Sequence, residues 1–217
     1  ADQDNNWPVA ADTEIEFCLA TRDPSGAPST GILRVPTTAG AFGSSDAVKF
    51  TNQGGSDAWP RDDYMNFWVC NLGGGLLGYA QFPGGNAATD GIVCGYQFVG
   101  IDGPGAGAYN LGRTATHEVG HWLNLRHIWG DGPCGSDDLV ADTPESDGAN
   151  FGCDLGSVSC GTEDMVQNYM DYSDDGCMNV FSQGQGDRMQ ALFVPGGTRA
   201  SILNSNGCLP AVPDFDL

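Results

Sequence analysis

All three histidines of the chain lie within the stretch HEVGHWLNLRH, from His117 to His127. On a helix, His117 and His121 are four residues apart and share one face, so both imidazoles can reach the same cation. Glu118 projects about 100° round the helix from His117, where it can hold a water on that cation without being a ligand. A zinc site of this kind lowers the pKa of bound water to about 7, and a carboxylate beside it can accept the proton. The pattern therefore indicates metal-assisted hydrolysis.

His127 can be a third ligand only if the helix ends before it. In a continuous helix, at about 100° per residue, His127 would lie on the wrong side of the helix relative to His121. Asn124 is suited to end the helix, because Asn tolerates the left-handed conformation better than most residues. A turn at Asn124 predicts that His127 returns to the metal. The alternative is a helix with two hydrogen-bonded histidines and a third in a loop.

The same stretch resembles the long zinc-binding signature of the metzincin metallopeptidases, with Asn124 where most of that clan has Gly. Further downstream, NYMDY resembles the methionine turn that lies beneath the metal in metzincins, with Met170 as its methionine. Without the histidine signature, Met170 would be an ordinary core methionine. Within the clan, the segments HIWGD, DTPE and NYMDYSDDGC resemble the pappalysin (cytophagalysin) family most closely.

The resemblance assigns roles to individual residues. It implies that His117, His121 and His127 bind zinc and that Glu118 is the general base and later the proton shuttle. Tyr172 matches a tyrosine that can approach the metal and stabilise an oxyanion, although an aromatic residue packed beneath the metal is the alternative. The implied substrate-binding residues lie in an edge strand that pairs with an extended peptide: Leu77, Gly78, Tyr79 and Ala80.

Acidic residues after the signature have two implied roles. The resemblance places a calcium site in the segment that contains Asp138, Thr143 and Glu145, and oxygen ligands suit such a hard cation. The alternative is an acidic, solvated surface. Some family members prefer a basic residue just after the scissile bond, and Asp174 or Asp175 is a candidate for the acidic pocket that this preference needs.

The cysteines favour a secreted protein with disulfides. Their number, eight, is even, and no two of them have the C-x2-C spacing of a zinc ribbon. The resemblance suggests two pairs, Cys134–Cys160 and Cys153–Cys177. Four cysteines have no implied partner, and they either pair or remain thiols: Cys18, Cys70, Cys94 and Cys208.

Composition limits the class of partner. The formal net charge of -20 argues against binding to nucleic acid or to an anionic membrane surface. A hydrophobic content of 40% predicts a folded chain, and 217 residues suit one domain. No apolar run approaches the roughly 20 residues of a membrane span, and no basic and apolar leader opens the sequence. We therefore expect a processed, extracellular monomer, made as a zymogen whose propeptide is absent here.

Periodicity and turn residues predict an α+β fold. Strands are expected over 11–21, 31–35, 64–72, 76–82 and 91–100, and helices over 113–124 and 184–193. Three glycines, Gly73 to Gly75, predict a hairpin turn between two of these strands. The resemblance implies a metzincin-type zincin, with a twisted, mixed five-stranded sheet and an active-site helix over a loop-rich lower lobe. We expect one domain over 1–217, with an upper lobe of about 1–124 and a lower lobe of about 125–217.

Together these features predict a secreted zinc-dependent endopeptidase. The alternative is a calcium-loaded, non-catalytic binding or adhesion domain with a structural metal site. Closed structural zinc sites use four protein ligands, whereas here three histidines are in register and a carboxylate lies beside the fourth position. This difference favours the enzyme.

Overall fold

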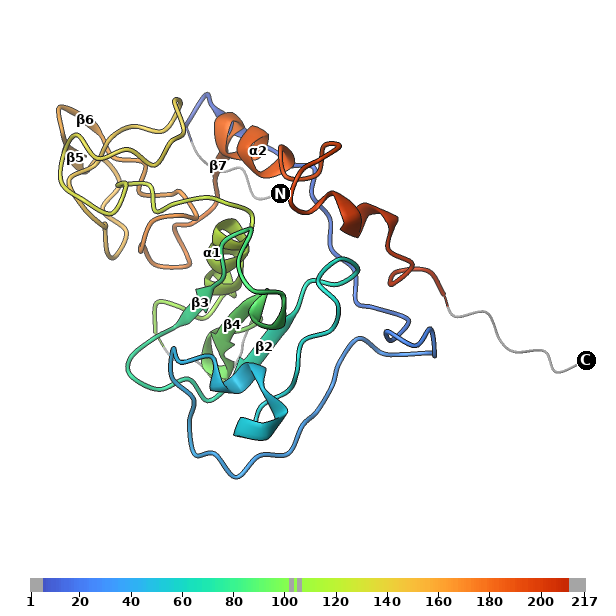
Figure 1. The fold of residues 1–217 in the computed structure, drawn as a ribbon. Helices are drawn as coiled ribbons and strands as arrows, with labels where there is room; N and C mark the ends of the chain where they lie inside the picture. The colour runs from blue at the N-terminus through green and yellow to red at the C-terminus, as the bar shows by residue number, and fades with distance from the viewer. Residues whose placement is uncertain (1–5, 102–103, 105–106, 211–217) are drawn as a thin grey trace, which may run out of the picture.

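The main sheet has three strands and lies against one helix (Figure 1). The computed structural model describes residues 6–101, 104 and 107–210. The spatial order is β2 (Phe67–Cys70), β4 (Ile92–Gly95) and β3 (Gly78–Ala80). Strand β4 runs parallel to β2 and antiparallel to β3, so the sheet is mixed, as expected.

Two expectations about the strands are wrong. Of residues 11–21, only Ala11 is in a strand, β1 (Ala10–Ala11), which pairs with β7 (Phe181–Ser182), and residues 31–35 form none. The described sheet therefore has three strands and not five. Alternating residues form a half-buried strand only beside a partner strand, and Phe17 and Leu19 are instead 55% and 64% exposed.

The predicted hairpin is also wrong, because β4 lies between β2 and β3. Residues Gly73–Gly75 do form a turn region, and Gly74 and Gly75 have φ of 75° and 77°. This left-handed conformation is accessible to glycine at little cost. The glycines lead the chain past the position of β4 rather than back along β2.

Helix α1 (Arg113–Trp122) packs on β3 and β4. On this side of the sheet, Ile92 and Cys94 join Trp122 and Leu123 in a buried cluster. On the opposite side, a second cluster contains Trp68 and Val93. No helix in the described part of the chain is both long enough and apolar enough to cross a membrane.

The segment after α1 is mostly irregular, as expected. Its regular elements are the pair β5 (Val158–Ser159) and β6 (Thr162–Glu163), then β7 and α2 (Gln183–Gln190). Ser182 caps the N-terminus of α2 through a capping box with Gln185, so the expected helix over 184–193 is present with shifted ends. Short 3-10 helices cover Ala47–Lys49, Thr51–Gln53, Ala87–Thr89, Tyr96–Phe98 and Ala200–Asn204.

Three disulfides fasten the irregular segments. Two are the implied pairs, Cys134–Cys160 and Cys153–Cys177. The third, Cys18–Cys208, joins the N-terminal segment to the C-terminal one. Cys70 and Cys94 are free thiols.

Both ends of α1 are held by distant residues. At the N-terminus, the Asp175 carboxylate accepts hydrogen bonds from the backbone N–H of Leu111 (2.7 Å) and Arg113 (3.2 Å). At the other end, Arg199 Nε donates to Trp122 O (3.0 Å) and Arg188 Nε donates to Asn124 O (2.8 Å). A negative charge at the start and positive charges at the end stabilise a helix. The helix that carries two of the histidines is thus fixed at both ends.

Candidate metal centre

The structure brings the three histidines together. Helix α1 ends at Trp122, and Asn124 follows with φ of 75°, the left-handed conformation expected of it. The chain then turns back, and one ring nitrogen from each of His117, His121 and His127 lies within 4.8 Å of the others. The Nε2 atoms of His121 and His127 are 3.1 Å apart.

Each imidazole is oriented through its Nδ1 atom. The partners of Nδ1 are Tyr169 O for His117 (2.7 Å), Leu125 O for His121 (2.8 Å) and Asp131 Oδ1 for His127 (2.5 Å). Because these partners are acceptors, Nδ1 carries the proton and the Nε2 lone pair is free for a cation. Asp131 was not identified from the sequence, and its place four residues after His127 is the one signal for it.

Burial also favours the neutral, metal-binding form of the His117 and His121 rings. It lowers the pKa of His117 well below its usual value, and the neighbouring His121 and His127 lower it further. Burial likewise lowers the pKa of His121 to about 4. Three imidazoles with converging ring nitrogens fit the ligand set of a catalytic zinc ion, which keeps one position open.

Glu118 is buried next to His117 in the chain, and its Oε2 atom has no hydrogen-bond partner among the described residues. Burial raises its pKa to about 8, whereas a bound cation would favour the charged form. Gly78 lies directly against this side chain: a Cβ atom there would be 2.8 Å from Glu118 Cγ and Oε1. The carboxyl group therefore lies against strand β3.

Tyr172 also reaches the site. Its hydroxyl oxygen is 3.1 Å from His127 Nε2, on the side where a cation would bind. The ring of Tyr172 packs edge-on against Trp129, with 4.9 Å between centroids, and Trp129 stacks on His127 at 4.3 Å. Trp129 fixes the position of both rings, and sequence reasoning did not identify it.

Met170 packs against helix α1 at Gly120. It is fully buried, and its carbonyl accepts a hydrogen bond from Ile128 N at 3.2 Å. Gly120 on α1 makes room for it, because a Cβ atom there would be 2.3 Å from Met170 Sδ. Helix α1 can thus pack closely on Met170 because residue 120 is glycine.

Strand β3 matches the implied substrate-binding segment. Gly78, Tyr79 and Ala80 form the strand, and the carbonyl of Leu77 accepts a hydrogen bond from Gly95 N at 2.8 Å. Strand β3 is an edge strand of the described sheet, with β4 on one side. An edge of this kind offers main-chain hydrogen bonds to an extended peptide.

The acidic residues that the sequence suggested for a calcium site or an acidic pocket have different hydrogen-bond partners. Asp138 is buried and accepts hydrogen bonds from Thr143 Oγ1 at 2.9 and 3.1 Å, and burial raises its pKa to about 6. Glu145 instead accepts a hydrogen bond from Gly135 N at 3.1 Å. Asp175 is buried, and its carboxylate accepts a hydrogen bond from Leu111 N just before α1, so it stabilises the start of that helix.

Comparison with known proteins agrees with this geometry. Residues 50–194 match the peptidase family M43, described as pregnancy-associated plasma protein-A. The chain belongs to this family. It is 44% identical over 136 residues to extracellular metalloprotease 1 of Coccidioides posadasii, a match over 59% of this chain and 49% of the relative. With an extracellular metalloprotease of Arthroderma benhamiae, 38% of 162 residues are identical, over 70% and 55% of the two chains.

Solved structures of the family have the same fold. Mature mirolysin of Tannerella forsythia, in complex with a cleaved peptide, matches with a TM-score of 0.87 and 48% identity, over 89% of this chain and 76% of that chain. Mirolysin in complex with compound 9 matches with a TM-score of 0.89 and 46% identity, over 94% and 80%. The α+β metzincin fold is therefore confirmed. The chain spans about half the length of the curated relatives it matches.

Proposed function

We propose that this chain is the catalytic part of a secreted zinc endopeptidase that hydrolyses peptide bonds in proteins. The observation that carries the proposal is the convergence of one ring nitrogen from each of three histidines, near a buried glutamate that lies against an edge strand. The curated relatives are named extracellular metalloproteases, and the disulfides agree with an oxidising compartment.

The residues of the site divide the work of hydrolysis. His117, His121 and His127 would hold the zinc ion, which supplies a polarised carbonyl and a lowered pKa for bound water. Glu118 accepts the proton of the attacking water and passes it to the leaving amine. Tyr172 donates its hydroxyl proton in a hydrogen bond to the oxyanion that develops on the substrate. Strand β3 holds the substrate peptide in an extended conformation. Because Gly78 has no side chain, the strand can lie close to Glu118.

A non-catalytic domain with a structural metal fits the site less well. A structural zinc site needs a fourth protein ligand, and no other His, Cys, Asp or Glu in the described ranges joins the three histidines. The carboxylate of Glu118 would also remain buried without a role, at a cost in stability.

Removal of the metal tests the proposed activity. The purified chain should cleave a peptide library, lose this activity in phenanthroline, and regain it when zinc is restored. The cleavage sites also test whether a basic residue is preferred after the scissile bond. Undiminished cleavage after the zinc content has fallen to zero would contradict the proposal.

We infer that calcium binds near Asp138, Thr143 and Glu145. The buried Asp138 carboxylate beside the Thr143 hydroxyl suits a hard cation, and burial raises the pKa of Asp138 to about 6. Millimolar calcium should raise the melting temperature of the chain. Asp138→Asn should abolish this rise, whereas Asp154→Asn, at an exposed position outside the segment, should retain it. An equal rise in all three proteins would contradict the assignment.

We also infer that residues 1–217 form a single, monomeric catalytic domain, made as a zymogen. A promirolysin mutant of Tannerella forsythia matches with a TM-score of 0.87 and 48% identity, over 89% of this chain and 67% of that chain, which supports a proform. N-terminal sequencing of precursor and active protein from the native source should reveal a removed segment. Activity in the unprocessed precursor equal to that of the mature form would contradict the zymogen.

A further inference from the structure

Strand β3 presents small side chains to helix α1 and a large one just beyond its end. Successive side chains of a strand point to opposite faces, so Gly78 and Ala80 face the same way. A Cβ atom on Gly78 would meet Glu118 of α1, and Ala80 packs against the buried cluster beneath that helix. Phe82 continues the alternation two residues further on. Its ring lies 5.3 Å from the ring of His121, so it is the first large side chain on the face toward α1.

Hydrogen bonds of Gln81 hold the backbone next to Phe82 in place. Gln81 N donates to Gly91 O at 3.1 Å, so the ladder with β4 extends one residue past β3. The Gln81 side chain closes the loop that follows: Nε2 donates to Asn86 O at 2.9 Å, and Oε1 accepts from Thr89 Oγ1 at 2.5 Å. Phe82 itself remains 42% exposed. An exposed ring on a fixed backbone loses little conformational freedom when it contacts a ligand.

An extended peptide on the free edge of β3 would bring side chains to this ring. Antiparallel pairing is the slightly more stable arrangement, and it places the N-terminal part of the peptide beside the C-terminal end of β3. Glu118 lies against Gly78 at the start of the strand, so under the proposed function the bond to be cleaved lies there. Cross-strand neighbours point to the same face, and an aromatic ring also reaches diagonal neighbours. Phe82 can therefore contact a substrate side chain about two to four residues before the scissile bond.

We propose that Phe82 is a specificity-determining residue, which binds an aromatic or large aliphatic side chain of the substrate on the N-terminal side of the scissile bond. Such side chains gain most from contact with an exposed ring, because both apolar surfaces leave water. The assignment rests on the proposed peptidase function and adds a substrate preference to it. This preference is separate from any preference for the residue that follows the scissile bond.

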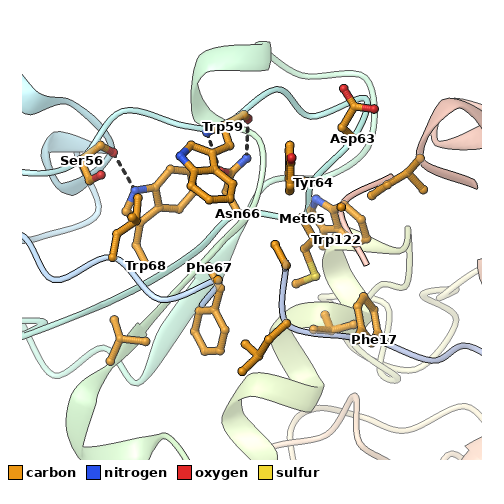
Figure 2. Close-up of a pocket in the computed structure, with 18 of the residues that line it drawn as sticks. Phe17, Ser56, Trp59, Asp63, Tyr64, Met65, Asn66, Phe67, Trp68 and Trp122 are labelled. Atoms are coloured by element: carbon orange, nitrogen blue, oxygen red, sulfur yellow. Dashed lines mark hydrogen bonds between the residues drawn. The ribbon is translucent and has the colours of Figure 1, made fainter. Parts of the chain in front are cut away.

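Cleavage of a peptide library by the zinc-loaded chain tests the assignment. The unaltered chain should cleave most often where an aromatic residue or leucine lies about two to four residues before the cut. Phe82→Ala should lose this enrichment, and Phe82→Arg should replace it with enrichment of acidic residues at the same position. Phe17→Ala is the matched control and should keep the profile of the unaltered chain. Phe17 is also exposed, at 55%, but it lines a different pocket with Met65 and Trp122 (Figure 2).

A binding measurement gives a second result that does not depend on hydrolysis. The zinc-loaded Glu118→Gln variant should bind a fluorescent peptide with phenylalanine at the enriched position about fivefold more tightly than the same peptide with alanine there. When Phe82→Ala is added to this variant, the two peptides should bind equally. Competition with a chromogenic chelator should give the same zinc affinity with and without Phe82→Ala, because the ring does not bind the metal.

Two results would overturn the assignment. If Phe82→Ala slows cleavage of the phenylalanine and alanine peptides by the same factor, the ring acts through His121 and not on the substrate. A library profile without enrichment before the cut would remove the preference while leaving the peptidase function intact. A different result separates the two proposals: if the unaltered chain cleaves nothing but peptide binding still depends on Phe82, the peptidase function is wrong and the binding role of Phe82 is supported.

Discussion

At the scale of single residues, the acceptors on the three Nδ1 atoms decide what the histidines can do. Two are backbone carbonyls, of Tyr169 and Leu125, and no side-chain substitution removes them. The third is the Asp131 carboxylate, which orients His127. Asp131 is therefore the acceptor that a substitution can remove to test how the hydrogen bonds on Nδ1 affect metal binding.

Asp131→Asn should lower the affinity for zinc about 10–100-fold, because the amide is a weaker partner for His127 than the carboxylate. Competition with a chromogenic chelator measures this affinity without reference to activity. The substitution Asp154→Asn, at an exposed position, controls for the loss of one charge. Unchanged zinc affinity in Asp131→Asn would mean that Asp131 does not act through His127.

Tyr172→Phe should reduce kcat about 10²–10³-fold with little change in KM, because the lost hydroxyl interacts with charge that develops only in the transition state. The ring stays packed against Trp129, so zinc content should not change. Tyr96→Phe, at an exposed tyrosine, is the matched control. A Tyr172→Phe variant with unaltered kcat would leave the tyrosine with a packing role.

At the scale of elements, α1 determines the geometry of the site. The sequence reveals its face and its end, because the positions of His117 and His121 and the left-handed turn at Asn124 are local properties. Its supports could not be predicted, because Asp175, Arg188 and Arg199 contact it across long loops. The order of strands β2, β4 and β3 is likewise a tertiary property. The run of glycines after β2 therefore predicted a hairpin that the structure does not contain.

Gly120→Ala should destabilise the protein by about 1–3 kcal/mol, because the new Cβ would overlap Met170 Sδ. Thermal unfolding measures this loss. In the double variant Gly120→Ala with Met170→Ala, the overlap is absent, so the second substitution should cost less than it does in the unaltered chain. Additive losses would show that Gly120 and Met170 do not interact.

At the scale of the whole molecule, part of the charge of -20 has a structural explanation. The acidic side chains with a structural explanation include Glu118 at the metal centre, Asp175 at the start of α1 and Asp138 in the candidate calcium segment. The sequence predicts the fold class because the histidine signature is rare and local. It does not predict that Phe67 and Val69 in β2 are 42% and 49% exposed, because their exposure depends on which neighbours the strand lacks.

Glu118→Gln tests the central claim most directly, because the amide keeps the shape of the side chain but cannot accept the proton of the attacking water. The variant should bind zinc with the stoichiometry of the unaltered chain and hydrolyse casein about 10²–10⁴-fold more slowly. Glu163→Gln, at an exposed position in β6, should hydrolyse casein at the unaltered rate. A zinc-loaded Glu118→Gln variant that cleaves casein as fast as the unaltered chain would contradict the account.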